Sequence, residues 1–95
     1  MDYSGSGAGN CKTVWEVVDY LIQSLDEKDL EDVRKMDEQD LSLLHFGLGQ
    51  YVRELSGLWR GNKELLADCG SEGMHADDAS AVIIRALWWR LQTKH

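Results

Sequence analysis

The chain has 95 residues, of which 43% are apolar and 28% are charged, with a formal net charge of −7 and no proline. This length corresponds to a single domain that buries its own core, and no apolar run approaches the roughly 18–20 residues of a membrane span. Direct binding of nucleic acid is disfavoured, because phosphate contacts require clustered Lys and Arg side chains.

The first residues are mostly small and polar, and we expect 1–11 to form a flexible leader ahead of a single helical domain spanning 12–95. This start lacks the basic and apolar segments of a signal peptide, which predicts a cytoplasmic protein.

Cys11 and Cys69 are the only cysteines. In a chain without an export signal, such a pair is expected to be two reduced thiols rather than a disulfide.

A first helix is predicted over about residues 14–25. Thr13 followed by Glu16 matches a capping box, in which each side chain accepts a hydrogen bond from the other residue's backbone amide. The apolar residues after it recur at helical spacing, at positions Val14, Val17, Val18, Leu21, Ile22 and Leu25.

Four further helices are predicted. Asp26 can cap a short second helix, Asp37 a third that ends at Ser56-Gly57, and Asn62 a short fourth that ends at Gly70. Acidic residues at 77 and 78 suit the positive end of the dipole of a last helix. The inner positions of the second and third helices are Leu30, Val33 and Met36, then Leu41, Leu44, Leu48, Val52 and Leu55. The fold class is therefore all-α, with about five helices in a compact orthogonal or bundle-like array.

Gly47 and Gly49 lie inside the predicted third helix. A glycine in a helix costs about 1 kcal/mol relative to alanine, so two of them require a physical reason. We expect another helix to approach closely at both positions. A phosphate-binding loop is excluded, because no strand precedes the glycines and Val52 stands where a third glycine would be needed.

Several polar side chains could meet between the third and last helices. Asp77 and Asp78 are the natural partners of a partly buried arginine at 53, and a structural ion pair is the favoured interpretation. A packed histidine is favoured at position 45, and the spacing of Cys69 and His75 matches no metal site, so no metal or cofactor is expected. The alternative is a small-ligand or catalytic module built from His45, Arg53, Asn62, Asp77 and Asp78.

The negative charge is concentrated in residues 26–40, where eight acids stand against three bases, a net charge of −5. A solvated helix face is the simplest interpretation, and a surface for a basic, nucleic-acid-binding protein is the functional one. Adjacent tryptophans near the C-terminus point about 100° apart on a helix, so both cannot face one core; self-association through them is a further alternative. The candidate partner surface is Asp29, Glu31, Asp32, Asp37, Glu38, Trp88 and Trp89.

Trp59 falls in the loop between the third and fourth helices, and Gly57 and Gly61 favour folding of that loop back onto the core.

Three motifs together resemble a family of small bacterial domains of unknown function. They are the run from His45 to Arg53 (HFGLGQYVR), the later Gly57-Leu58-Trp59 with Asn62, and Asp77-Asp78-Ala79-Ser80. The resemblance covers roughly residues 13–91, and it departs at Glu54, where the relatives often carry Asn. It implies a helical fold and a bacterial or phage origin, and it supplies no activity.

The chain shows no serine or cysteine nucleophile beside a base and no paired carboxylates in a glycosidase-like setting. We therefore expect a non-enzymatic, acidic helical domain that acts through protein–protein contacts. An immunity-type or anti-defence inhibitor is the most concrete form of this expectation.

Overall fold

The computed structural model describes residues 11–58 and 61–93, without the side chains of His45 and Thr93. A 3₁₀ segment (η2, Glu38–Leu44) and a π-helical segment (η3, His45–Gly49) precede α3, and the described residues contain no strand, so the all-α prediction is confirmed. No described helix has the length and apolar character needed to cross a membrane. The α-helices are α1 (Val14–Ser24), α2 (Glu27–Lys35), α3 (Gln50–Leu55), α4 (Lys63–Cys69) and α5 (Ala76–Thr93).

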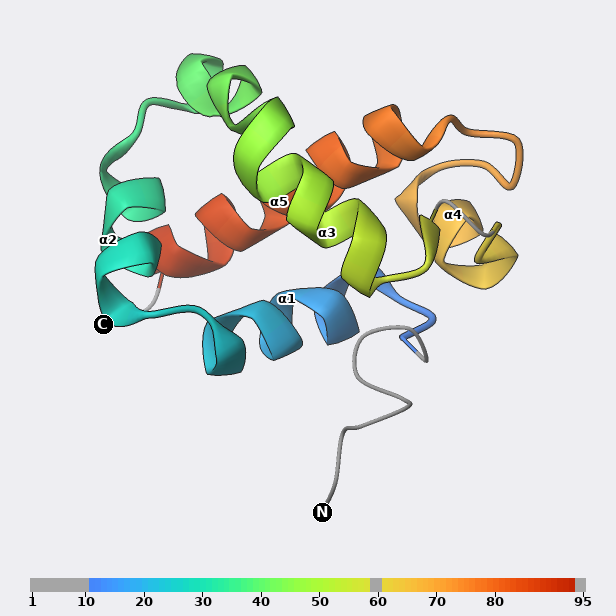
Figure 1. Cartoon of the computed structure of the whole chain (residues 1–95), viewed down its shortest axis with the longest axis horizontal. Helices are drawn as coiled ribbons and strands as arrows, with labels where there is room; N and C mark the ends of the chain where they lie inside the picture. Colours follow the sequence, from blue (N-terminus) through green and yellow to red (C-terminus); the bar gives the residue numbers. More distant parts are fainter. Residues whose placement is uncertain (1–10, 59–60, 94–95) are drawn as a thin grey trace.

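The long helix α5 organises the fold, because it contacts every other helical segment described. Figure 1 shows it running behind η3 and α3, with α1 below and α2 beside its C-terminal end. The core is formed where α5 meets α1, and the side chains with no exposed surface there are Val17, Val18, Leu21, Ala79, Ile83 and Leu87. Val17, Val18 and Leu21 belong to the apolar positions predicted for the first helix.

Helix α1 begins as predicted. The Thr13 hydroxyl accepts a hydrogen bond from the Glu16 amide at 3.2 Å, and the Glu16 carboxylate accepts one from the Thr13 amide at 3.2 Å. This reciprocal pair satisfies two of the amides that the first turn leaves without an internal acceptor. The capping box is therefore confirmed.

The predicted third helix has the expected extent and an unexpected geometry. It follows Asp37, whose carbonyl accepts a hydrogen bond from the Asp40 amide at 2.9 Å, and it ends at Ser56 before Gly57, which has φ of +74°. Between these ends the chain passes from 3₁₀ through π to α geometry. The prediction of one regular helix is wrong, because the two glycines of η3 favour an α-helix poorly and leave the backbone free to widen a turn.

Helix α2 is attached mainly through its C-terminal end. Its single fully buried side chain is Val33, and the predicted cap Asp26 precedes the helix without a side-chain capping bond. Two donors from α5 reach its terminal carbonyls: Trp88 Nε1 donates to Met36 O and Gln92 Nε2 donates to Arg34 O, each at 2.8 Å. Side-chain hydrogen bonds from α5 thus replace the intrahelical partners that the last turn of α2 lacks.

Asn62 caps α4, as predicted, with its Oδ1 accepting from the Leu65 amide at 3.3 Å. Its Nδ2 donates to the carbonyls of Cys11 and Ser56, each at 3.0 Å. Cys11 is therefore part of the folded domain, one residue earlier than predicted. The rest of the predicted leader, residues 1–10, lies outside the described residues, as does Trp59.

Candidate functional site

Arg53 joins α3 to the first turns of α5. Its side chain is 5% exposed, Nη1 donates to Ser80 Oγ at 3.0 Å, and Nε lies 3.4 Å from Asp77 Oδ1. Ser80 Oγ in turn donates to the Asp77 carbonyl at 2.9 Å. A buried guanidinium requires such compensation, because an uncompensated charge in the core is costly. The predicted ion pair between the third and last helices is present.

The other members of the predicted polar cluster do not converge on this contact. Asp78 is exposed and forms no described contact with Arg53, and Asn62 uses its side chain as the α4 cap. The side chain of His45 lies outside the described residues. His75 was considered only as a metal ligand and was not included in the predicted polar cluster, but it lies next to Asp77: its Nδ1 accepts a hydrogen bond from the Asp77 amide at 3.0 Å. The sequence signal that could have placed His75 there was its position two residues before Asp77, where the last helix was predicted to begin.

The two glycines of η3 differ sharply in their surroundings. Gly49 is buried, and a Cβ added there would lie 3.1 Å from Arg53 Nη1, 3.3 Å from Leu44 O and 3.7 Å from Ile84 Cδ1. Close approach of α5 is thus confirmed at Gly49. At Gly47 the prediction is wrong, because an added Cβ would meet nothing within 4 Å.

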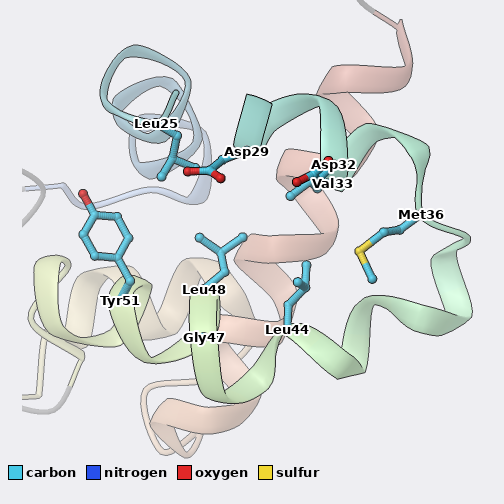
Figure 2. Close-up of a pocket in the computed structure, with 9 residues that line it drawn as sticks. All are labelled: Leu25, Asp29, Asp32, Val33, Met36, Leu44, Gly47, Leu48 and Tyr51. Atoms are coloured by element: carbon cyan, nitrogen blue, oxygen red, sulfur yellow. The ribbon is translucent and has the colours of Figure 1, made fainter. Parts of the chain in front are cut away.

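Gly47 instead opens onto a groove between α2 and the η3–α3 segment. This α2–η3 groove has a volume of about 380 Å³. In Figure 2, Tyr51 and Met36 stand at its two ends with Leu48 and Leu44 between them, and Asp29 lies on the α2 side near Leu25. Most of the lining is apolar, and its full set is Leu25, Asp29, Asp32, Val33, Met36, Leu44, Gly47, Leu48 and Tyr51.

Large apolar side chains remain exposed on the same segment. Leu43 is 75% exposed and Phe46 82% exposed, and Tyr51 at the groove end is 41% exposed. Two tryptophans on other helices are also exposed. Trp15 on α1 is half exposed, with the Arg90 guanidinium 5.0 Å from its ring centre, and Trp89 on α5 is 56% exposed. Among these side chains Tyr51 also lines the groove, so the groove end combines a concave surface with exposed apolar area, which is characteristic of binding surfaces.

The structure divides the predicted acidic surface. Asp29 and Asp32 lie in the groove, whereas Glu38 lies 3.5 Å from Arg85 and Asp37 is exposed with no described ion pair. Glu31 is paired with Arg34, and that hydrogen bond lowers the pKa of its carboxyl group. Two of the five acids are therefore brought to a concave surface.

The adjacent tryptophans have separate roles. Trp88 is half-buried, and its indole N–H donates to the Met36 carbonyl, so this side chain supports a groove wall rather than presenting a free partner surface. Trp89 is exposed, in agreement with the expectation that both could not face the core.

Within residues 11–58 and 61–93, no group of three His, Cys, Asp or Glu side chains is arranged to hold a metal ion.

The groove, the Arg53 contact and the α4 cap all fall within a segment that is shared with other proteins. A family described as a domain of unknown function (DUF6794) matches residues 12–91. The chain belongs to the DUF6794 family. No curated protein and no solved structure matches this DUF6794 domain. The family assignment agrees with the predicted resemblance to a family of unknown function, and it brings no activity with it.

Proposed function

We propose that this DUF6794 domain is a non-enzymatic protein-interaction domain that binds a partner protein through the α2–η3 groove and the exposed apolar side chains beside it. The observation that supports the proposal best is the apolar lining of the groove, which is open at Gly47. An immunity-type or anti-defence inhibitor of bacterial or phage origin is the form we favour. The partner is then a basic protein such as a nucleic-acid-binding effector.

The chemistry of the groove supports a protein ligand. Its lining offers leucine, valine, methionine and tyrosine side chains, and the buried core of a protein interface is apolar, with methionine and tyrosine enriched. Phe46 and Leu43 are further exposed apolar side chains in the η2–η3 segment, outside the groove lining. Covering these side chains would recover about 25 cal/mol for each Å² of apolar surface removed from water.

The alternative, a ligand-binding or catalytic module around His45, Arg53, Asp77 and Asp78, has less support. The Arg53 side chain is buried and engaged with Asp77 and Ser80, so it is held in place by the fold. A substrate-binding arginine would be expected to reach an open cavity.

Site-specific photo-crosslinking in the native host tests the proposal. A photoreactive phenylalanine analogue is placed at Phe46, and the matched control carries it at Trp89, an exposed aromatic position on α5. We expect one covalent adduct of defined mass from position 46, and its loss when Leu48→Glu puts a charge into the groove. Thermal unfolding of Leu48→Glu checks that the fold persists.

The same experiment can contradict the proposal. An adduct from position 46 that survives Leu48→Glu in a folded domain would show that the groove is not the binding surface. An adduct from position 89 alone would move the partner surface to α1 and α5.

A further inference from the structure

The two walls of the α2–η3 groove have matching spacing. One wall presents Leu44, Leu48 and Tyr51, at positions i, i+4 and i+7 along the chain. The facing wall on α2 repeats this spacing, with Asp29 followed by Val33 and Met36. In an ideal α-helix with a rise of 1.5 Å per residue, side chains at i, i+4 and i+7 span roughly 10 Å, or about two turns.

Rows of this length suit an amphipathic helix as the occupant. A helix laid in a groove contributes side chains at i, i+3 or i+4, and i+7, which is the period that both walls present. Addition of a partner strand is not available in the described part of the chain, since it contains no strand whose edge could be extended. The groove therefore recognises side chains from a helical face.

The charge of the lining selects among such helices. The α2 wall contributes two carboxylates, Asp29 and Asp32, and none of the nine lining residues is Lys or Arg. Asp32 lies 3.3 Å from Lys28, a largely exposed pair that contributes little. Among the described residues, no cation lies within salt-bridge distance of Asp29. Glu31, by contrast, forms an ion pair with Arg34.

From this arrangement we propose that the groove binds a cationic amphipathic helix of the partner protein, with apolar anchors against Leu44 and Leu48 and a Lys or Arg beside Asp29 and Asp32. The inference rests on the proposed function and specifies its ligand. Lys and Arg suit such a position, because their apolar stems pack along the groove while the charged end meets the carboxylates. A helix with Glu at that position would place like charges together and be rejected.

Three synthetic fluorescent peptides test this chemistry. They share one leucine face at i, i+4 and i+7 and differ only in carrying Lys, Gln or Glu beside it, and binding to the full chain is measured by fluorescence anisotropy at low salt. We expect the Lys peptide to bind about tenfold more tightly than the Gln peptide, as two exposed ion pairs would give. The Glu peptide should bind most weakly.

Matched double variants locate the effect. Asp29→Asn with Asp32→Asn should weaken binding of the Lys peptide about tenfold and abolish the preference for Lys over Gln. The control, Asp26→Asn with Glu27→Gln, removes the same charge from α2 at residues outside the groove lining and should change affinity by less than about twofold. An equal loss in both double variants would overturn the assignment to Asp29 and Asp32.

The remaining outcomes separate this inference from the proposed function. Equal affinity for all three peptides, or no binding of any, overturns the cationic helix, while a groove-dependent adduct from position 46 would still support a protein ligand. Competition by phenethylammonium at the same concentration as the Lys peptide would also overturn it, since a small organic cation would then suffice.

Discussion

Two sides of one short segment, residues 45–55, differ in almost every physical respect. On one side Gly49 and Arg53 contact α5, with the arginine held by Asp77 and Ser80. On the other, Gly47 and the half-buried Leu48 border an open groove. The α5 side is packed and its charges are compensated, whereas the groove side leaves apolar surface uncovered. The first side stabilises the domain, and the second carries the proposed binding surface.

The largest effect is expected at the α5 side. Arg53→Ala removes a buried side chain and its contacts with Asp77 and Ser80, and should lower the free energy of unfolding by about 3 kcal/mol, measured by urea denaturation. Asp77→Asn should cost about 1 kcal/mol, because that carboxylate is 40% exposed and water compensates part of the loss. A change of less than about 0.5 kcal/mol for Arg53→Ala would mean that the contact does not stabilise the fold.

The two glycines give the most direct contrast. Gly49→Ala should destabilise the domain by about 1 kcal/mol, because the new methyl group would crowd Arg53 Nη1 at 3.1 Å and the Leu44 carbonyl at 3.3 Å, at a cost larger than the gain in helix propensity. Gly47→Ala meets open space and should stabilise the domain by up to about 1 kcal/mol. Thermal and urea unfolding of the two variants measure both changes. Shifts of the same sign would contradict the division of the segment into a packed and an open side.

The groove wall can be weakened through Trp88. Trp88→Phe keeps most of the packing and removes the hydrogen bond to the Met36 carbonyl, so it should destabilise by about 1 kcal/mol and increase amide exchange within α2. Trp89→Phe is the matched control, since that side chain is exposed and its substitution should change stability by less than about 0.5 kcal/mol. Equal effects of the two substitutions would remove Trp88 from the support of the groove.

The smallest effect depends on pH and again concerns the α5 side. The Cys69 thiol lies 3.7 Å from the Ala79 carbonyl, and burial, followed by the nearby Asp68 charge, raises its pKa to about 11 from an ordinary value of 9.0. The folded state therefore holds this proton more tightly than the unfolded state, so stability is unaffected below pH 9 and falls between about pH 9 and 11. We expect a loss below about 1 kcal/mol at pH 9.5, relative to Cys69→Ala titrated in parallel. A similar loss in Cys69→Ala would assign the effect to other groups.

Local chemistry allowed much of the fold to be predicted from the sequence. The capping box of Thr13 and Glu16, the Asn62 cap and the pairing of Arg53 with an acid at the start of α5 each depend on a few residues with strong preferences. The groove could not be predicted in this way. Leu44 and Leu48 have the period of core residues, and periodicity does not tell whether a neighbouring helix covers them.

The two glycines also show that sequence alone does not tell which side of a helix another helix covers. Gly47 and Gly49 are chemically identical and two residues apart, yet only the second faces another helix. The π-helical turn changes which residues point toward α5, and such a turn leaves no regular sequence signal. The prediction that Asn62 joins the polar cluster was wrong for a different reason. Its side chain forms hydrogen bonds with the Ser56 carbonyl and the Leu65 amide and does not contact Arg53.

The attachment of α2 determines how easily each wall of the groove can move. The η3–α3 wall is continuous with the core through Val52 and Gly49, whereas α2 is held by one buried side chain, Val33, by the partly buried Leu30 and Met36, and by two hydrogen bonds from α5. Local opening of α2 therefore costs less free energy than global unfolding. The groove therefore has one rigid wall and one more mobile wall, and its width changes with the position of α2.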